Sequence, residues 1–499
     1  MRRDLLDLAE CHRRAALARL DAKDQAALGQ FFTPMRAAAL IASLPRLPEV
    51  GALRILDPGA GSGMLSAAIV ARVLSETPDV SVHIVAVEAD LVVLPHLIET
   101  LEACKAAGHG RVTYEVVEAD YIQASTGLDA DDRLAGFDLC IQNPPYAKLA
   151  AKSPARAAIK AAGVDSPNLY AAFLALATAA LAEGGQLVAI TPRSFANGPY
   201  FGAFRRYLLD QVSLDRVHVF ESRSTVFADT GVLQENVIFS ATKHGSRERV
   251  MLSVSNDHHD DAAHRTVPYS DVVNPEDEHR FIRIAANDAD IAIAELMLTL
   301  PCTLADLGVK VSTGPVVDFR SRRCLHTEAV DGGLPLIYPG NVRGGRIEWP
   351  REIRKAQWYL PVDAADERWL VPEGWYTVIK RFSAKEERRR IVAAVWSPDV
   401  KPGPLALENH LNYLHLGGVG LDRELAYGLS LWLNSSLVDQ FFRTFSGHTQ
   451  VNATDLRTMR FPRIDSLRAL GAAGPDHLPE QNEIDALVDA ALTAAAAAA

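Results

Sequence analysis

Residues 138–146 read Asp138-Leu139-Cys140-Ile141-Gln142-Asn143-Pro144-Pro145-Tyr146. This pattern predicts an apolar strand that leads into a polar side chain, two prolines and an aromatic ring. The prolines fix φ and remove two backbone donors, so the turn is stiff. A stiff turn at a strand end can aim the Asn143 side-chain oxygen and the Pro144 carbonyl at one point. Two convergent acceptors can hold a planar amino group through both N–H bonds, and Tyr146 offers a face for a stacked heterocycle. An ordinary Pro-Pro turn is the alternative, and the neighbouring stretches argue against it.

Upstream lies a glycine-rich connection between a strand and a helix. Leu53 to Asp57 is predicted to be a buried strand, Pro58-Gly59-Ala60-Gly61-Ser62-Gly63 a loop, and Met64 to Leu74 a helix. Glycines in such a turn let a ligand approach the backbone closely. The dinucleotide fingerprint GxGxxG requires glycine where Met64 stands, so that motif is absent. The loop instead resembles the S-adenosylmethionine loop of class I methyltransferases.

Acidic residues follow the next two predicted strands. The second strand ends in Glu88, which can bind the two ribose hydroxyls of a nucleoside. Asp120 follows the third strand and can accept a hydrogen bond from an adenine amino group, with Tyr121 or Ile122 against the ring. Singly, each acid is typical of a solvated strand end. Their recurrence at successive strand ends, before the Asn143 turn, favours one shared nucleoside site.

Strands and helices alternate through residue 240, which predicts an α/β fold with a doubly wound, mostly parallel sheet. The predicted helices include Leu5 to Leu28, Met35 to Leu44 and one from Asn168 to Ala182, and the further strands are Val82 to Val87, Thr113 to Val117, Gln186 to Thr191, 215–220 and 235–240. Thr33 is predicted to be an N-cap and Pro34 a first-turn residue. A simple helix start does not explain the paired aromatics, Phe31 and Phe32, that precede them.

Length and composition set broad limits. A chain of 499 residues with 48% hydrophobic residues predicts a soluble protein of two or three domains. The five cysteines form no CxxC pair or Cys/His cluster, so we expect a reducing cytosol and no metal site. No apolar run is long enough to span a bilayer, and the N-terminus predicts an amphipathic helix. The net charge of −11 does not by itself indicate a nucleic-acid partner.

The C-terminal half differs in character from the rest of the chain. The predicted organisation is a helical arm over 1–27, an α/β domain over 28–245, a connector over 246–300, a mixed α+β domain over 301–465 and a tail helix over 466–499. Basic residues cluster in the fourth segment, and a polar stretch, Ser446 to Asn452, is dense in groups that bond base edges. The predicted DNA-contacting residues are Arg320, Arg343, Lys380, Arg381, Lys385, Arg388, Arg389, Arg390, His448, Gln450 and Asn452. A solvated basic face and a plain polar loop are the alternatives.

Taken together, residues 28–240 resemble the amino-methylating DNA methyltransferases of the γ class, of which the TaqI enzyme is a model. Gly29 to Pro34 matches the N-terminal cofactor motif of that class, Asn143 to Tyr146 its catalytic motif and Asn168 to Phe173 a motif near the methionine end of the cofactor. Phe227 resembles a second aromatic residue that packs on a flipped base. The resemblance implies S-adenosyl-L-methionine as cofactor, bound by Phe32, Thr33, Pro34, Asp57, Pro58, Gly59, Gly61, Gly63, Glu88, Ala89, Asp120, Tyr121, Asn143, Tyr170 and Phe173.

The C-terminal half resembles the PstI and BsuBI type of modification methylase. The resemblance rests on Val311 to Arg320, Arg381 to Arg389 and Gly447 to Arg457. It implies a bacterial, cytoplasmic enzyme that is associated with the nucleoid when bound to DNA. It further implies a monomer that methylates adenine N6 in CTGCAG by base flipping, and a cognate restriction endonuclease as functional partner.

Three other functions remain open at this point. Methylation of cytosine N4 uses the same chemistry at an exocyclic amine. Methylation of glutamine N5 in a protein uses the same Asn-Pro-Pro-Tyr arrangement but leaves the basic C-terminal domain without a role. A non-catalytic DNA-binding subunit is argued against by the intact motif at Asn143.

Overall fold

The computed structural model describes residues 2–21, 25, 29–127, 130–150, 152–166, 168–220, 236–255, 263–284, 288–383, 388–445, 450–475 and 477–497. The chain divides into two compact units, and each is described by itself. The first comprises Met1–Ala286 with Phe445–Gly447, and the second Asn287–Thr444 with His448–Ala499. Within the described ranges, no helix is both long enough and apolar enough to cross a membrane.

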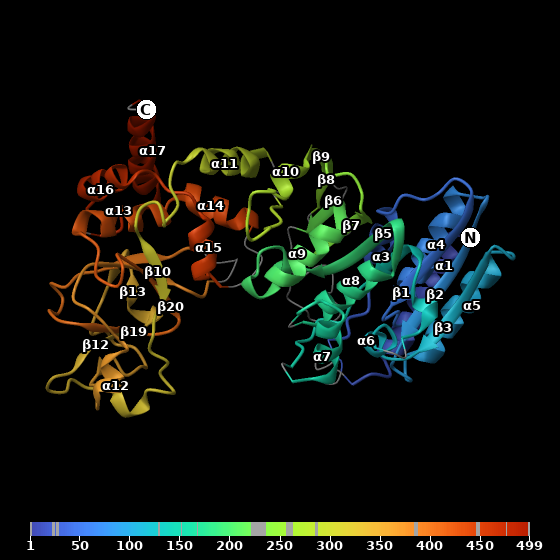
Figure 1. The fold of residues 1–499 in the computed structure, drawn as a ribbon, viewed down its shortest axis with the longest axis horizontal. Helices are drawn as coiled ribbons and strands as arrows, with labels where there is room; N and C mark the ends of the chain where they lie inside the picture. Colours follow the sequence, from blue (N-terminus) through green and yellow to red (C-terminus); the bar gives the residue numbers. More distant parts are fainter. Residues whose placement is uncertain are drawn as a thin grey trace. The chain divides into compact units, whose positions relative to one another are not determined.

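The first unit is built on a nine-stranded sheet in the order β3-β2-β1-β4-β5-β7-β6-β8-β9 (Figure 1). The strands are β1 Gly51–Pro58, β2 Val80–Glu88, β3 Val112–Glu118, β4 Phe137–Gln142, β5 Leu181–Pro192, β6 Val212–Phe220, β7 Asn236–Lys243, β8 Arg249–Ser255 and β9 Ala263–Pro268. Strands β3, β2, β1, β4 and β5 are parallel, and β7 runs antiparallel between β5 and β6. The predicted doubly wound, mostly parallel sheet is confirmed.

Two layers of helices cover this sheet (Figure 1). One layer holds α1 Arg2–Leu17, α3 Met35–Ser43, α4 Met64–Glu76 and α5 Leu94–Ala107, and the other holds α6 Tyr121–Ala124, α7 Pro154–Ala161, α8 Leu169–Ala180 and α9 Gly202–Gln211. Nearly every residue of α4 and α8 is buried, so both helices are apolar around most of their circumference. Burial on both faces of the sheet explains the almost continuous apolar runs in β1, β2 and β4.

Two predicted boundaries of the first unit are wrong. The connector expected over 246–300 contains β8 and β9, which extend the same sheet, and α10 Tyr269–Val272, which packs on them. Two polar stretches suggested a linker: in the sequence, Asn256 to Asp261 falls between these two strands, and Asn274 to Glu278 follows α10. The arm expected over 1–27 is also not separate, because Leu5, Leu6 and Ala9 of α1 are buried in the core beside α4 and α5.

The second unit combines two small sheets with a group of helices (Figure 1). One sheet has the order β10-β20-β17-β18-β14-β13, and the other β11-β15-β12-β19-β16. The strands are β10 Lys310–Thr313, β11 Leu325–His326, β12 Leu334–Ile337, β13 Val342–Arg343, β14 Arg346–Ile347, β15 Trp358–Tyr359, β16 Leu370–Val371, β17 Tyr376–Lys380, β18 Ala393–Trp396, β19 Leu405–Leu407 and β20 Leu411–His415. The helices are α11 Asp288–Thr299, α12 Ala364–Glu367, α13 Arg423–Leu433, α14 Ser436–Phe445, α15 Ala453–Thr458, α16 Ile464–Ala473 and α17 Gln481–Ala497.

The segment expected as a tail helix over 466–499 is an integral part of this unit. It contains most of α16 and all of α17, and α16 packs against α13. Glycines make the α13–α16 contact possible, because a Cβ on Gly428 would lie 1.8 Å from the carbonyl oxygen of Leu467. A Cβ on Gly471 would meet the carbonyl oxygen of Glu424 at the same distance. The two backbones therefore approach as closely as glycine allows.

Candidate active site

The carboxyl ends of β1, β2, β3 and β4 border one cavity in the first unit. The predicted site residues that line it are Phe32, Thr33, Gly59, Gly61, Glu88, Ala89, Asp120, Tyr121, Asn143, Pro145 and Phe173. Other lining residues were not among the individually predicted cofactor ligands. Gly29, Gln30, Phe31, Ala60, Ser62 and Leu169 lie within the predicted motifs, whereas Met64, Leu65, Val87 and Ala119 lie outside them. Several predicted residues do not line it: Pro34, Asp57, Pro58, Gly63, Pro144, Tyr146 and Tyr170.

The glycine loop forms one wall of the cavity. Gly59 and Gly61 both have positive φ, at 70° and 56°. A Cβ on Gly61 would lie 3.0 Å from the ring of Phe32, and one on Gly59 would lie 3.3 Å from the ring of Phe173. Larger residues here would crowd these two rings, and the positive φ values would strain the backbone of any residue other than glycine. Glycine at these two positions therefore keeps the loop backbone accessible from the cavity.

Glu88 at the end of β2 supplies a buried carboxylate, 8% exposed. Its Oε2 accepts a hydrogen bond from the backbone N–H of Gly61 at 2.8 Å, and its Oε1 accepts from Ala89 and Asp90 at 2.9 and 2.8 Å. A carboxylate has roughly four acceptor positions, so about one remains for a ligand, on Oε2. Burial raises the pKa of Glu88. The carboxylate therefore ties the glycine loop to the end of β2 in addition to facing the cavity.

Asp57 and Gly63 support the loop from behind. Asp57 is 1% exposed, and its Oδ2 accepts a hydrogen bond from the Ser66 hydroxyl at 2.6 Å. Burial raises the pKa of Asp57 to about 7. Gly63 is the N-cap of α4 at φ 82°, where a Cβ would meet Leu97 and Thr100. Both were predicted to bind the cofactor, but neither lines the cavity, because Asp57 bonds to α4 and Gly63 packs against α5.

Asn143 follows β4 with its side chain held in one orientation. Its Nδ2 donates to the carbonyl oxygen of Phe31 at 2.6 Å and to the hydroxyl of Thr33 at 3.0 Å. A carbonyl oxygen only accepts, so the amide nitrogen must face Phe31. The remaining Oδ1 is buried and accepts no hydrogen bond from any described residue. A buried, unused acceptor costs roughly 1–3 kcal/mol, which calls for a functional explanation.

The segment before α3 packs directly on this turn. The backbone N–H of Tyr146 donates to the carbonyl oxygen of Gly29 at 3.0 Å. A Cβ on Gly29, which has φ 68°, would lie 2.7 Å from the Tyr146 backbone. The predicted N-cap role of Thr33 is wrong: Pro34 is the N-cap of α3, and the Thr33 hydroxyl accepts from Asn143 instead.

Two tyrosines lie beside the turn rather than on the cavity wall. Tyr146 donates from its hydroxyl to the Ile190 carbonyl at 3.3 Å, and its ring lies 5.7 Å from that of Phe31 and 6.3 Å from that of Tyr170. Tyr170 stacks on Phe201 at 5.4 Å, which accounts for its absence from the cavity. Burial raises the pKa of both hydroxyls. Phe227, the predicted second stacking residue, lies outside the described residues.

The end of β3 contributes an acid and an aromatic ring. Asp120 is exposed and lines the cavity, and its Oδ1 accepts from the backbone N–H of Gln123 at 3.0 Å as the N-cap of α6. Tyr121 is 2% exposed, and its ring lies 5.0 Å from that of Phe173. In the sheet order β3-β2-β1-β4, the strand ends that precede Asp120 and Asn143 lie on opposite sides of β1, the strand that leads into the glycine loop.

In the second unit, some of the predicted DNA-contacting residues are buried and others are exposed. Arg390 is only 1% exposed: its Nε donates to the Ser383 hydroxyl at 3.2 Å, and its guanidinium lies over the ring of Phe442. The prediction for Arg390 is wrong, because a buried guanidinium cannot reach a phosphate. Arg389 is half-buried and donates to the Asn434 side chain at 3.3 Å, and burial lowers its pKa.

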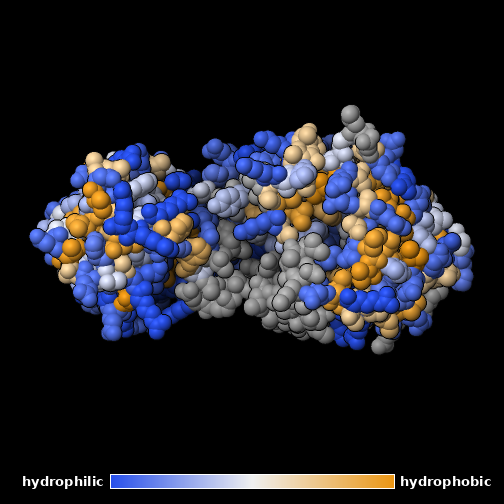
Figure 2. Space-filling view, turned by 90° about the horizontal axis from the view of Figure 1, so that it is seen from below, coloured by the Kyte–Doolittle hydropathy of each residue, from blue (hydrophilic) through white to orange (hydrophobic). Residues whose placement is uncertain are grey.

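Other predicted residues of this unit remain at the surface. Arg320, Arg343 and Arg388 are exposed, and Lys380, Arg381 and Gln450 are half-buried. Hydrophilic residues cover most of the face of this unit at the left of Figure 2. Asn452 was expected to contact a base edge but is the N-cap of α15, with its side chain engaged with Asp455. Lys385 and His448 lie outside the described residues.

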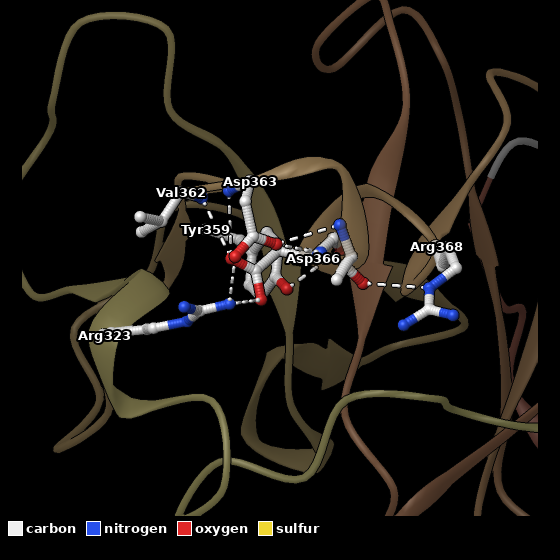
Figure 3. A network of polar contacts seen from close by, with 7 residues as sticks. Arg323, Tyr359, Val362, Asp363, Asp366 and Arg368 are labelled. Carbon is white, nitrogen blue, oxygen red and sulfur yellow. Dashed lines mark hydrogen bonds and ion pairs between the residues drawn. The ribbon is translucent and has the colours of Figure 1, made fainter.

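Not every exposed cation of this unit is available to DNA. Arg323 donates to Asp363 and Asp366, both at 2.8 Å, at the start of α12 (Figure 3). Asp366 also accepts from the backbone of Val362, and the Tyr359 hydroxyl donates to its carbonyl oxygen. The guanidinium beside Asp366 lowers the pKa of that carboxyl to about 2. This network fixes the loop around α12 and uses Arg323 internally.

Known proteins resemble this chain in sequence. Residues 99–227 match the model of the Eco57I restriction-modification methylase family. The type II methyltransferase M.PstI of Providencia stuartii is 39% identical over 492 residues, which cover 97% of each chain. The type II methyltransferase M.BsuBI of Bacillus subtilis is 41% identical over 458 residues, which cover 90% of each.

A solved structure extends the fold comparison. The type IIL restriction-modification enzyme MmeI, determined in complex with DNA, aligns with a TM-score of 0.57 at 12% identity, covering 89% of this chain and 70% of that one. At this identity the likeness concerns the fold alone. With two relatives near 40% identity over almost their full length, the chain belongs to the type II methyltransferases of restriction-modification systems, and it is a DNA methyltransferase whose cofactor is S-adenosyl-L-methionine.

Proposed function

We propose that this DNA methyltransferase acts on N6 of adenine in duplex DNA. The observation that carries the proposal is the Asn143 side chain, whose nitrogen is engaged by Phe31 and Thr33 and whose Oδ1 has no partner among the described residues. Only an incoming donor can satisfy that oxygen. An exocyclic amino group has two N–H bonds, and the carbonyl of Pro144 is the second acceptor that we assign to it. Held in this way, the amine nitrogen becomes more tetrahedral and more nucleophilic.

The residues around the turn complete the proposed site. A base inside a duplex cannot reach Asn143, so the target adenine must be flipped out. Tyr146, with Phe227 as its partner by resemblance, would stack on the flipped base and offset part of the unstacking cost. Rate enhancement then comes from orientation and from acceptors that are already in place.

The cavity has the features that the cofactor needs. Gly59 and Gly61 leave space for close approach to the backbone, and Glu88 retains an acceptor for a ribose hydroxyl. We assign Asp120 to the adenine amino group, with Tyr121 and Phe173 against the ring. Bound S-adenosyl-L-methionine supplies an electrophilic methyl group. The chain's own contribution is to place the amine held by Asn143 in line with that methyl group.

The relatives support a proposal for the biological role. Two type II methyltransferases align along almost all of this chain, including the second unit, which supports a recognition role for that unit. We propose that the enzyme protects CTGCAG sites from a cognate restriction endonuclease and acts as a monomer in the bacterial cytoplasm. A palindromic site does not require a dimer, because each strand can be modified in a separate encounter.

The test measures the modified nucleoside and its position. The protein is expressed in a methylation-free host, and digested plasmid DNA is examined by mass spectrometry for N6-methyladenine and N4-methylcytosine. The plasmid is also challenged with a nuclease that cuts CTGCAG. N6-methyladenine and resistance to cutting are expected. Detection of N4-methylcytosine alone would make cytosine the target base instead of adenine. Full cutting would discard only the CTGCAG site. Labelling of protein but not DNA would refute the proposal.

A further inference from the structure

Three stretches singled out in the C-terminal half of the sequence meet at one end of β17 and β20. The backbone N–H of Arg381 donates to the carbonyl oxygen of His410 at 3.0 Å, and Val451 donates to that of Arg381 at 2.7 Å. Asn409 donates to the carbonyl oxygen of Val316 at 2.9 Å. Three side chains at this junction, Phe382, His410 and Gln450, are together called the recognition edge.

His410 is held at the surface by a buried acid. Its Nδ1 lies 2.5 Å from Oε1 of Glu408, and its backbone N–H donates to Oε2 of the same carboxylate at 2.9 Å. The Glu408 side chain is 2% exposed, whereas that of His410 is 51% exposed. Nδ1 is engaged with the Glu408 carboxyl, so Nε2 is the nitrogen left for a ligand. Nε2 has no hydrogen-bond partner among the residues that the structure describes.

Phe382 and Gln450 complete the recognition edge. Phe382 is 44% exposed, and its ring lies 5.1 Å from that of His410. Gln450 is half-buried and forms a β-bridge with Phe382. A fixed imidazole, an amide and an exposed aromatic ring within one junction offer a hydrogen-bonding and apolar surface of the kind that contacts base edges and thymine methyl groups.

The charges around the recognition edge favour a polyanion. Lys380 and Arg381 precede Phe382 and are half-buried, and Arg320 is exposed on the neighbouring segment. Of the acids nearby, Asp318 is paired with Lys355 at 2.8 Å and Glu408 is bonded to His410. Among the described residues, Asp318 and Glu408 are therefore engaged within the protein, whereas Lys380 and Arg320 flank the exposed groups. The Arg381 guanidinium donates to the carbonyl oxygen of Asn409 at 2.6 Å. A DNA duplex fits this combination of flanking positive charge and central base-reading groups.

We propose that the recognition edge reads the target sequence, with Nε2 of His410 bonded to a base edge in the major groove and Phe382 packed beside it. From the sequence, base reading was predicted for the stretch around His448, and neither His410 nor Phe382 was among the predicted DNA contacts. Glu408 is the positioning residue, because its buried carboxyl contacts both Nδ1 and the backbone N–H of His410 and so holds the ring in one orientation. This inference rests on the proposed action on duplex DNA.

The test compares His410→Ala and Phe382→Ala with Trp369→Ala, a matched control because Trp369 is 43% exposed in the same unit but lies outside the recognition edge. Dissociation constants are measured for the preferred duplex of the wild-type protein and for duplexes with each base pair replaced in turn, with S-adenosylhomocysteine present. Modified positions in host DNA are mapped by long-read sequencing.

We expect His410→Ala and Phe382→Ala to lose about tenfold or more of the discrimination at one or two base pairs, since one good base contact contributes roughly 1–3 kcal/mol. Trp369→Ala should discriminate like the wild type, and His410→Gln, which keeps an acceptor and a donor, should recover part of the loss. Equal weakening on every duplex, or unchanged discrimination, would overturn the inference. Unchanged affinity for S-adenosylhomocysteine serves as the folding control. If the wild type itself modified no DNA, the proposed function would fail instead.

Discussion

The side-chain nitrogen of Asn143 lies 2.6 Å from the carbonyl oxygen of Phe31, although the two residues are 112 positions apart in the chain. The same nitrogen lies 3.0 Å from the hydroxyl of Thr33. All three residues line the cavity. The segment before α3 therefore has two roles: it forms part of the cofactor cavity, and it sets the orientation of the side chain that we assign to the target amine.

The first prediction concerns Thr33. Thr33→Val keeps the shape of the side chain but removes the acceptor, so Asn143 loses one of two orienting bonds. We expect about a fivefold decrease in the single-turnover rate, since one hydrogen bond contributes roughly 1 kcal/mol. The affinity for S-adenosylhomocysteine, measured by calorimetry, should change little. Thr33→Ser should restore the rate; equal rates for the Val and Ser variants would refute the positioning role.

The second prediction concerns Asn143 itself. Asn143→Ala deletes the acceptor that we assign to the target amine, and a preorganised hydrogen bond of this kind contributes on the order of 3 kcal/mol, or a hundredfold or more in rate. Methyl transfer should be lost, while cofactor binding should stay close to that of the wild type. Asn143→Asp tests the orientation separately, because a carboxylate cannot donate to the Phe31 carbonyl. Near wild-type turnover by Asn143→Ala would exclude this turn as the reaction site.

The third prediction concerns Glu88. Glu88→Ala should weaken binding of S-adenosylhomocysteine at least tenfold and leave DNA affinity unchanged. The carboxylate holds the Gly61 backbone as well as offering an acceptor to the ribose, so the variant loses both a ligand contact and a restraint on the loop. Glu88→Gln keeps one acceptor oxygen, so its affinity for S-adenosylhomocysteine should lie between those of the wild type and Glu88→Ala. Calorimetry and DNA-binding assays on the same preparations measure both affinities, and unchanged cofactor affinity would show that Glu88 supports the loop only.

The local signals in the sequence were sufficient to predict the parallel sheet of the first unit and the residues at its strand ends. Strand ends, the glycine loop and the Pro-Pro turn each follow from residue type within a few positions, and the structure brings Gly61, Glu88 and Asn143 to one cavity. Their partners were harder to predict, because hydrogen bonds such as that between Asn143 and Phe31 join positions far apart in the chain. The paired aromatics Phe31 and Phe32 were a visible signal, but only Phe32 was included in the predicted site.

In the second unit, the sequence did not allow the burial and partners of individual polar side chains to be predicted. The sequence of three consecutive arginines does not show which of the side chains is buried. Arg390 is the buried one, because its guanidinium donates to the Ser383 hydroxyl and lies over the ring of Phe442. Asn452 has the same donors and acceptors at a helix cap as at a base edge. His410 could not be singled out, because its fixed orientation depends on the burial of Glu408.

The fourth prediction concerns pH and the buried Asp57. Burial raises its pKa from 3.8 to about 7. Below pH 3.8 the carboxyl is protonated in both the folded and the unfolded chain, and its contribution to stability is fully present. As the pH rises toward 7, the unfolded chain ionises first, so that contribution is lost. The difference in unfolding free energy between wild type and Asp57→Asn should therefore shift against the wild type by roughly 3 kcal/mol between pH 5 and pH 8.

Urea denaturation of both proteins at the two pH values measures this difference. Groups other than Asp57 are common to both proteins, so their titration cancels in the comparison. Asparagine can still accept from the Ser66 hydroxyl, which keeps the local bond comparable. A difference that does not change with pH would show that Asp57 ionises as readily in the folded protein as in the unfolded chain.

The last prediction separates two neighbouring arginines. Arg388 is exposed, whereas Arg390 is 1% exposed, bonded to Ser383 and placed over Phe442. If Arg388 contacts a phosphate, Arg388→Ala should weaken binding to all duplexes by a similar factor and reduce the slope of log affinity against log salt concentration by about one. Arg390→Ala should instead lower the melting temperature, since it leaves the Ser383 hydroxyl without this donor and a gap beside Phe442. Titrations at several salt concentrations and thermal unfolding of both variants measure the two effects. If Arg390→Ala had normal stability and a reduced salt slope, the Arg390 guanidinium would contact DNA. If Arg388→Ala had an unchanged salt slope, Arg388 would not be a phosphate contact.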